Sequence, residues 1–390
     1  MTVATVAVPS RVALREAQRR EQSITRAVVL LMVPVVLLLV VGLGAMLSAS
    51  SVVGLRETGD SLYHFKRHVV WLVVGVVAMV VAALMPMSWW RRLAFPVFFC
   101  SVALLVAVLA VGVRSGGATR WLAVGPVSVQ PSEAAKLSTI LLLATVMSRR
   151  ERWIAGFWSF LVPVVLSSGV VIGLIMLQPD FGTTVVVAAA SFAIMLASAA
   201  PFGYVVGSAI GAAGLGVVGA ISAPYRWQRV TAFLDLQSDP FHSSYQAIQG
   251  LVALGTGGLF GVGLGASRAR WSYLPNAHTD FVFAILGEET GLAGSLLVVA
   301  LFTTLTVAGT MIARNCSDRF GRLAAIGITA WLSVQALVNI GGVVGLLPIT
   351  GVPLPFMSFG GTALVVSLIG VGILVSIARH TEPIGVGPRR

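Results

Sequence analysis

The stretch AVVLLMVPVVLLLVVGLGAMLSA, at residues 27–49, contains no charged residue. A hydrophobic helix of about 20 residues is long enough to span the hydrocarbon core of a lipid bilayer. Several arginines precede the run, as they also would in a signal peptide, but no convincing small-residue cleavage site follows it. We therefore expect this run to be the first, uncleaved span of a membrane protein.

Nine further apolar runs follow the first. They lie at about residues 69–86, 93–113, 134–148, 157–176, 181–199, 203–222, 281–313, 322–345 and 361–378. Of the 390 residues, 57% are hydrophobic and only 10% are charged, and the mean hydropathy is +0.94. Soluble domains have about 25% charged residues, so the composition excludes a soluble enzyme, a disordered chain and a disulfide-stapled secreted domain. We expect an all-α polytopic membrane protein with about ten transmembrane helices.

The net charge of +12 comes from 26 Lys and Arg against 14 Asp and Glu. In a membrane protein such an excess is typical of cytoplasmic loops, so no nucleic-acid partner is expected. If the N-terminus is cytoplasmic, 16 of these cations fall in cytoplasmic segments and 10 in outer segments. The bias predicts two cytoplasmic tails, at residues 1–26 and 379–390, around a ten-span domain at residues 27–378.

One long connection, at about residues 223–280, lies on the predicted outer face. It is rich in aromatic residues, and its cations include Arg226 and Arg229. The positive-inside rule does not require cations on this face. The outer arginines therefore indicate an anionic partner on that side of the membrane.

Two features divide this outer loop. Residues 244–254, SYQAIQGLVAL, have an amphipathic helical pattern with Ile248, Leu251 and Val252 on one side, which predicts a helix at the membrane interface. The following GTGGLFGVGLG, at residues 255–265, lacks the strand and helix that a nucleotide-binding glycine loop needs. We interpret it as a tight, flexible return to the membrane surface.

The segment LPNAHTDFVFAILGEE, at residues 274–289, has the densest polar groups beside a span. It places His278 and Asp280 at the outer end of a long apolar run, with Glu288 and Glu289 about two helical turns deeper. Polar groups at such depth are functional candidates because their burial is costly. An Asp at a helix start can also be a cap or a dipole partner, so both interpretations of Asp280 stay open here.

A second polar segment is GATRWLAVGPVSVQPSEAAK, at residues 117–136. Its Gly-Pro and Gln-Pro pairs mark turns, as in a tight re-entrant loop. Glu133 and Lys136 are three residues apart and can form an ion pair. Arg120 next to Trp121 is a cation beside a large aromatic side chain, which suits a phosphorylated lipid headgroup.

The third polar segment is QALVNIGGVVGLLPITGVPLPFMSFGG, at residues 335–361. Gln335 and Asn339 are four residues apart and share one helix face. Three prolines predict an extended stretch, and Ser358 with a glycine pair interrupts the next span. Non-helical backbone at membrane depth is tolerated only where it is buried in protein or lines a cavity.

At these three segments the chain resembles the FtsW/RodA family, also called SEDS (shape, elongation, division and sporulation) proteins, over residues 45–378. The motifs are LSASSV at 47–52, RW at 120–121, QPSEAAK at 130–136, YRWQRV at 225–230, YQAIQ with GTGGLFGVGLG, LPNAHTDFVFAILGEE, and LPITGVPLPFMSFGG. Their order on ten apolar runs is highly specific. Ala277 and Gly287 resemble the cell-division branch, FtsW, more than the elongation branch, RodA.

The resemblance implies a peptidoglycan glycosyltransferase with Asp280 as its catalytic residue. Such enzymes polymerise lipid II, an undecaprenyl-pyrophosphate disaccharide-pentapeptide, at the outer face of the cytoplasmic membrane, here for the division septum. The implied partners are a class B penicillin-binding protein transpeptidase and other division-complex membrane proteins. An elongation-type, RodA-like polymerase is the alternative within the family.

The residues suit this chemistry. An acceptor sugar hydroxyl loses a proton as it attacks the donor, and one positioned carboxylate can accept that proton. A glycosidase needs a second carboxylic acid for its leaving group, whereas a pyrophosphate leaves as a stable anion that cations can stabilise. The candidates for the pyrophosphate are Arg120, Lys136, Arg226 and Arg229; the other substrate-binding candidates are Trp121, His278, Gln335, Asn339 and Ser358. The sequence shows no cluster of metal ligands and leaves open a divalent cation, Mg²⁺ or Mn²⁺.

Two other classes of function remain as alternatives. A lipid II flippase, which is a transporter, would suit broken spans and the intramembrane Glu288 and Glu289. A non-catalytic scaffold would only recruit division proteins, and the presence of Asp280 weighs against it. Because function follows from the chemistry of a site rather than from a fold, the polymerase is the preferred hypothesis.

A cysteine in place of Asp239, in the long outer loop, tests the topology. We expect a membrane-impermeant thiol reagent to label Asp239→Cys in intact cells, because a cytoplasmic N-terminus and seven preceding spans put this loop outside. The background replaces the native Cys100 and Cys316 with alanine. Labelling that requires cell lysis would contradict the predicted orientation.

Overall fold

The structure, a computed structural model of the chain, describes residues 11–115, 118–125, 127–149, 156–221, 227, 231, 233, 235, 244–271 and 279–380. Within these ranges each of the ten predicted apolar runs coincides with helical structure. Nine runs correspond to one labelled helix each, of which α11 is interrupted at Gly291: α1 (Arg11–Thr58), α2 (Tyr63–Leu84), α3 (Met87–Val111), α4 (Pro131–Arg149), α7 (Phe181–Ala197), α8 (Phe202–Ile221), α11 (Val282–Asn315), α12 (Arg319–Val343) and α13 (Gly361–Arg379). The run at 157–176 forms α5 (Phe157–Val164), the π-helical turn η1 (Val165–Gly169) and α6 (Val170–Leu177) in succession.

Eight of these segments, among the described residues, are long and apolar enough to cross a membrane. The other two are α7, which has 17 residues, and α4, which carries Glu133 and Lys136. Both pack against other helices of the bundle: α4 against α3, α12 and α7, and α7 against α12 and α4. The all-α polytopic architecture is therefore confirmed.

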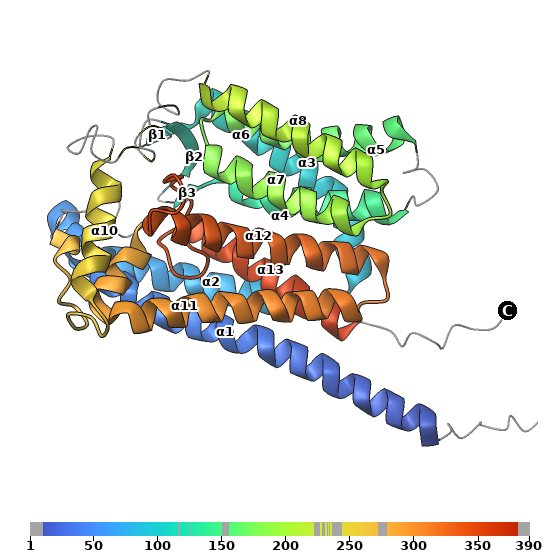
Figure 1. Cartoon of the computed structure of the whole chain (residues 1–390), viewed down its shortest axis with the longest axis horizontal. Helices are drawn as coiled ribbons and strands as arrows, with labels where there is room; N and C mark the ends of the chain where they lie inside the picture. The colour runs from blue at the N-terminus through green and yellow to red at the C-terminus, as the bar shows by residue number, and fades with distance from the viewer. Residues whose placement is uncertain are drawn as a thin grey trace, which may run out of the picture.

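The first helix is longer than predicted. It begins at Arg11, inside the segment predicted as an N-terminal tail, and it has 48 residues. At 1.5 Å per residue it extends for about 72 Å, more than twice the hydrocarbon thickness of a bilayer. Figure 1 shows its first turns projecting beyond the other helices. The apolar pattern marked only the span, because the helix continues through polar sequence.

A small sheet occupies the segment that was predicted as a re-entrant loop. Strands β1 (Val113–Ser115), β2 (Ala118–Val124) and β3 (Val127–Val129) are antiparallel in the order β1-β2-β3. Gly125, at φ 60°, lies in the turn between β2 and β3, where a left-handed backbone favours glycine. Hydrogen bonds between the strands pair backbone N–H and C=O groups that an irregular loop at a membrane surface would leave without a partner.

The two ends of the bundle differ. Figure 1 shows β1–β3, the helix α10 (Tyr245–Gly257) and the connection between α12 and α13 at one end, which we call the site end. The first turn of α1 and the last turn of α13 lie at the opposite end, which we call the terminal end. The predicted polar segments therefore gather at one end of the molecule, away from both terminal helix ends.

Helix packing relies on close approach of small residues, as is common between membrane helices. Helices α2 and α13 approach closely: a Cβ at Gly372 would lie 2.3 Å from the Met79 carbonyl oxygen and 2.7 Å from the Cβ of Ala82. The outer helix α8 is the opposite case, because Leu215 is 74% exposed and Gly207 has no atom of a described residue within 4 Å of its would-be Cβ.

We expect Gly372→Val to wedge α13 away from α2. Overpacking of a close contact typically lowers the free energy of unfolding by about 1–3 kcal/mol. Thermal unfolding of the detergent-solubilised protein measures the change. The matched control is Gly207→Val on α8, which introduces the same β-branched side chain at an open helical position. Equal losses of Tm in the two variants would show that the close contact is unimportant.

Candidate functional site

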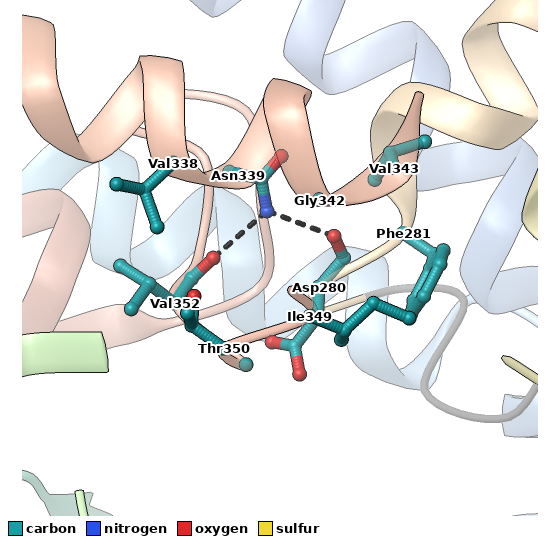
Figure 2. A pocket seen from close by; sticks show the side chains of 10 residues that line it. Asp280, Phe281, Val338, Asn339, Gly342, Val343, Ile349, Thr350 and Val352 are labelled. Atoms are coloured by element: carbon teal, nitrogen blue, oxygen red, sulfur yellow. Dashed lines mark hydrogen bonds between the residues drawn. The ribbon is translucent and has the colours of Figure 1, made fainter. Parts of the chain in front are cut away.

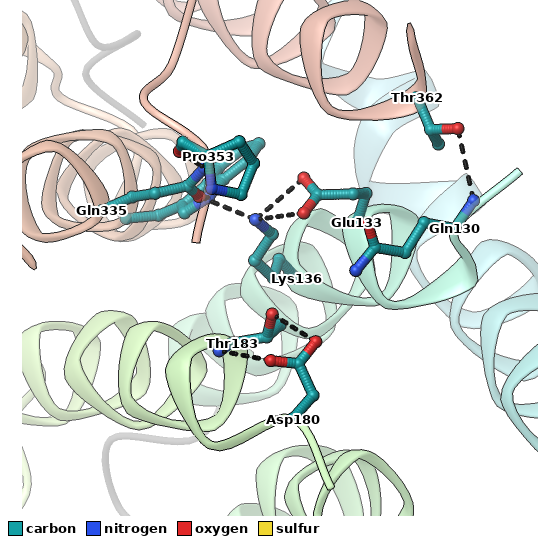
Figure 3. Close-up of polar contacts among 9 residues, drawn as sticks. Gln130, Glu133, Lys136, Asp180, Thr183, Gln335, Pro353 and Thr362 are labelled. Carbon is teal, nitrogen blue, oxygen red and sulfur yellow. Dashed lines mark hydrogen bonds and ion pairs between the residues drawn. The ribbon is translucent and has the colours of Figure 1, made fainter. Parts of the chain in front are cut away.

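A buried cation joins two helices near the site end. The Nζ atom of Lys136 on α4 lies 2.9 Å and 2.8 Å from the carboxylate oxygens of Glu133, and it donates a hydrogen bond to Gln335 Oε1 on α12 at 2.7 Å. Trp331 Nε1 donates to the same oxygen at 2.7 Å. Figure 3 shows Lys136 between its two partners. The predicted pairing of Glu133 with Lys136 is confirmed.

The position of Lys136 differs from the expectation. It was predicted as a cation for the pyrophosphate, but it lies in the second turn of α4 and only 1% of its side chain is exposed. Its ammonium group also lies 5.3 Å from the centroid of the Trp331 ring. Its hydrogen bond to Gln335 ties α4 to α12, and its charge is paired with Glu133 inside the bundle instead of projecting from a surface.

Two side chains of α12 clamp the connection to α13. Gln335 Nε2 donates to the Pro353 carbonyl at 2.9 Å, and Asn339 Nδ2 donates to the Val352 carbonyl at 2.8 Å. The same Asn339 nitrogen donates to the backbone carbonyl of Asp280 at 2.8 Å (Figure 2). Gln335 and Asn339 therefore share one helix face, as predicted, and they fix two extended segments at the site end.

Asp280 lies at the edge of a pocket of about 200 Å³, its open mouth included. The pocket is lined by Asp280, Phe281, Val338, Asn339, Gly342, Val343, Ile349, Thr350, Gly351 and Val352. Figure 2 shows the Asp280 carboxylate on the opposite side of the residue from Asn339. The side chain is half-buried. A carboxylate in this position can meet a ligand while its backbone is held by α12.

The local geometry bears on the capping interpretation of Asp280. The N-cap position of α11 is occupied by Phe281, whose side chain has no hydrogen-bond acceptor. Asp280 precedes the cap, outside the N-terminal end of α11. The N-cap residue of α11 is therefore Phe281 and not Asp280, so capping of this helix does not account for the acidic residue at position 280.

Arg120 and Trp121 lie on β2 at the same end. Arg120 donates from Nη2 to the Pro179 carbonyl at 2.5 Å, and its Nη1 lies 3.9 Å from Asp180 Oδ1. Asp180 in turn accepts a hydrogen bond from the Thr183 N–H at 3.1 Å and caps α7. Arg120 thus holds the sheet on the α6–α7 connection, and part of its charge is already engaged.

Asp180 was not among the predicted site residues. The sequence marks Asp180 as a possible helix start, because this acid lies three residues before a threonine at the beginning of an apolar run. Ser358, by contrast, was predicted as a substrate-binding residue and is buried. Its Oγ accepts a hydrogen bond from the Leu354 N–H at 2.9 Å, so it shapes the turn before α13.

The glycine-rich run packs its backbone on α11. Val262 N–H donates to the Glu288 carbonyl at 2.9 Å and Gly263 N–H to the Glu289 carbonyl at 3.2 Å. A Cβ at Gly261 would lie 2.0 Å from the Glu289 carbonyl oxygen, so only glycine allows this approach. At Gly291, where φ is 68°, the helix is interrupted. The glycines therefore serve a close backbone contact, consistent with the predicted tight return of the chain.

Both intramembrane carboxylates have structural partners. Glu288 accepts hydrogen bonds from the Ser267 hydroxyl at 2.5 Å and from the backbone N–H groups of Arg268 and Ala269 at 3.0 and 3.2 Å. Glu289 accepts a hydrogen bond from the Ser48 hydroxyl on α1. Glu288 thus holds the 3-10 turn η2 (Ala269–Trp271), and the two carboxylates give no particular support to an ion-coupled transporter.

The predicted amphipathic helix is present as α10. The buried residues are Gly250, Ala253 and Gly257, while Val252, on the predicted apolar side, is 51% exposed, which is compatible with an interfacial helix whose apolar side faces lipid. Small residues face the protein because α10 lies close against α11, where a Cβ at Gly257 would lie 2.1 Å from the Gly287 carbonyl.

Three of the predicted site residues, Arg226, Arg229 and His278, lie outside the described residues. Among the residues that the structure does describe, no group of three or more His, Cys, Asp and Glu side chains could hold a metal ion.

The fold and the site define the class: a polytopic helical membrane protein with a carboxylate-lined pocket at one end of its bundle. Residues 29–383 match the profile of the FtsW/RodA/SpoVE family, described as "Cell cycle protein". The chain belongs to the FtsW/RodA/SpoVE family.

Among its relatives, the stage V sporulation protein E of Bacillus subtilis (strain 168) is 40% identical over 90% of this chain and 97% of its own length. The probable peptidoglycan glycosyltransferase FtsW of Thioalkalivibrio sulfidiphilus (strain HL-EbGR7) is 39% identical over 97% of this chain and 93% of its own. The two values are nearly equal, so they support the family and do not separate its branches.

Solved structures show the same fold. A chain from "Structural coordination of polymerization and crosslinking by a peptidoglycan synthase complex" aligns with a TM-score of 0.73 and 28% identity, over 90% of this chain and 96% of that one. The rod shape determining protein RodA of Thermus thermophilus aligns with a TM-score of 0.67 and 26% identity, over 90% and 97%.

We expect Lys136→Met to destabilise the protein strongly, because it leaves Glu133 charged and buried. Breaking a buried pair in this way typically costs about 3–5 kcal/mol, measured here as thermal unfolding in detergent. The double variant Glu133→Gln with Lys136→Met should recover much of that loss. The matched control is Lys66→Met, which breaks the exposed Lys66–Asp60 pair of the same 2.8 Å length and should change stability little. A parental Tm for Lys136→Met would mean that the buried pair is dispensable.

Proposed function

We propose that this protein is a peptidoglycan glycosyltransferase that polymerises lipid II into glycan strands at the outer face of the cytoplasmic membrane. The observation that carries the proposal is the half-buried Asp280 carboxylate beside a pocket, with its backbone clamped by Asn339. The names of the relatives support the same activity.

Asp280 acts as the general base in this proposal. The acceptor hydroxyl attacks the anomeric carbon of the donor sugar, the bond to the pyrophosphate breaks, and the hydroxyl proton passes to the carboxylate. Asn339 acts as a positioning residue, because it contacts the Asp280 backbone and does not reach the proton. The pyrophosphate leaves as an anion and needs electrostatic stabilisation instead of an acid.

The contacts of the described cations narrow the choice of residues for the pyrophosphate. Lys136 is neutralised by Glu133, and Arg120 is partly engaged by the α6–α7 connection. This leaves Arg226 and Arg229, in the long loop, as the principal candidates, with Arg120 at the edge. Trp121 and His278 are proposed to contact the sugar or lipid headgroup, and Mg²⁺ or Mn²⁺ could assist the arginines. In this proposal the network of Gln335 and Ser358 shapes the site without binding substrate.

The finer assignment is to the cell-division branch, with septal wall synthesis as the role. Ala277 and Gly287 suit this branch, and FtsW names are frequent among the relatives. A sporulation-type or elongation-type polymerase is the alternative, since a SpoVE relative is equally similar. The proposed partners are lipid II, a class B penicillin-binding protein transpeptidase and other division-complex membrane proteins. The proposed orientation puts both termini in the cytoplasm and the site end outside.

Lipid II supplied to the purified protein, with its cognate class B penicillin-binding protein, tests the function. Glycan strands support the polymerase. Movement of lipid II across vesicle membranes without strand formation would instead support the flippase. If neither strands nor lipid movement were observed, the result would support the non-catalytic scaffold.

Asp280→Asn should abolish strand formation while expression and membrane insertion stay near normal. Asn keeps the size of the side chain and can still accept a hydrogen bond, but it does not accept a proton at neutral pH. Loss of a general base typically lowers a rate about 100- to 10,000-fold, which gel separation of the strands can measure.

The matched control is Asp60→Asn, the same chemical change in the α1–α2 connection. The pKa of Asp60 is lowered by the hydrogen bond from Lys66 and by that from the Leu62 N–H, so this carboxylate is also ionised at neutral pH. The control should retain activity. Strand synthesis at the parental rate by Asp280→Asn would exclude Asp280 as the base.

A further inference from the structure

The start of α7 packs against the connection between α12 and α13. Gly182, the second residue of α7, is buried, and a Cβ at this position would lie 2.2 Å from Val352 Cγ2, 2.9 Å from Thr350 Cβ and 3.0 Å from the Thr350 carbonyl oxygen. These distances leave no room for a methyl group, and Val352 is β-branched, so its side chain has few other rotamers. Gly182 therefore lets the connection lie directly on α7, at two residues that line the pocket beside Asp280.

The same stretch of the connection reaches the Asp280 carboxylate through Gly351. The backbone of Gly351 has a φ of 72°, in the left-handed region that favours glycine. A Cβ at this position would lie 3.3 Å from Asp280 Oδ2. The backbone of the connection thus comes close to the carboxylate proposed as the base, and a small displacement of this stretch changes the space beside that oxygen.

Two supports hold this stretch of the connection. The first is Asn339, whose Nδ2 donates to the Val352 carbonyl and to the Asp280 carbonyl, each at 2.8 Å. The second is Gly182, where the contact is steric and meets Val352 and Thr350. The amide therefore fixes the backbone of the connection, and the surface of α7 fixes how deeply its side chains can pack.

The start of α7 is itself held by several contacts. Asp180 accepts hydrogen bonds from the N–H of Thr183 at 3.1 Å and from its hydroxyl at 2.9 Å, which Figure 3 shows. Arg120 on β2 donates to the connection between α6 and α7 at 2.5 Å, and Gln178 Nε2 donates to the Leu105 carbonyl on α3 at 3.1 Å. A helix start that is held in this way is a rigid support. A methyl group added at Gly182 would therefore displace the connection more than it displaces α7.

We propose that Gly182 is a positioning residue of the proposed glycosyltransferase site. Because it has no side chain, the connection can rest on α7, and this contact sets the distance between Gly351 and the Asp280 carboxylate. The inference rests on the proposed function, since it assigns Gly182 an effect on the reaction at Asp280. A displacement of about 1 Å can cost about 100-fold in rate, so Gly182 can affect catalysis without touching the substrate.

Gly182→Ala in the purified full-length protein, assayed with its cognate class B penicillin-binding protein and lipid II, tests the proposal. We expect kcat for strand formation to fall about 10- to 100-fold while KM for lipid II changes less than about threefold, because the base is displaced and substrate binding is not. The matched control is Gly327→Ala on α12, where a Cβ would lie 2.6 Å from Ile194 Cδ1 on α7 and 2.7 Å from Ile140 Cγ2 on α4. It overpacks α12 against α7 away from the connection, so it should lower Tm and leave kcat near the parental value.

A second substitution distinguishes this contact from general damage. The double variant Gly182→Ala with Val352→Ala removes the atom nearest to the new methyl group, so most of the lost kcat should return. Val352→Ala alone completes the double-mutant cycle. If Gly182→Ala does not fold, Val352→Ile tests the same contact from the other side, because it enlarges the side chain that rests on Gly182. Its kcat should also fall, with KM nearly unchanged.

The outcomes separate this proposal from the proposed function. If the parental protein makes strands and the folded Gly182→Ala or Val352→Ile variant keeps the parental kcat, Gly182 is not a positioning residue and the glycosyltransferase assignment stands. An equal loss of kcat in Gly327→Ala, or no recovery in the double variant, would overturn the positioning role as well. A parental protein that makes no strands would overturn the proposed function, and the role of Gly182 with it.

Discussion

The buried ammonium group of Lys136 is the constraint on which the site end depends. A charge at this depth cannot find water, so it requires a complete set of internal partners. Glu133 supplies the opposite charge and Gln335 supplies an oxygen, and the amide of Gln335 is thereby oriented toward the Pro353 carbonyl. The ion pair lies within α4, and the hydrogen bond from Lys136 to Gln335 links α4 to α12 and, through the Gln335 amide, to the connection that leads to α13.

The position of Asp280 depends on these contacts of α12. Asn339 lies one turn further along α12 than Gln335 and ties the Asp280 backbone to the Val352 backbone. The carboxylate proposed as the base is therefore not placed by its own side-chain contacts alone. Its backbone is held by a helix whose register is fixed by the buried Lys136, which is the kind of rigid support that a reacting group needs.

Much of this could be predicted from sequence, and the omissions have physical reasons. Apolar length located all ten helical runs, and spacing paired Glu133 with Lys136 and put Gln335 beside Asn339. The strands β1–β3 were missed because three to seven residues between turns carry too little periodicity. The depth of Lys136 was missed because burial depends on helices distant in sequence.

The contact between the glycine-rich run and α11 limits how this region can vary. Four backbone hydrogen bonds cross it: Val262 and Gly263 donate to carbonyls before the interruption at Gly291, and Leu292 and Ala293 donate back to Gly258 and Leu259. Such a pattern behaves like the register of paired strands, in which one added residue shifts every partner at once. Surface loops usually tolerate insertions and deletions. The number of residues in this loop is fixed, because its backbone completes the hydrogen bonding of a membrane helix.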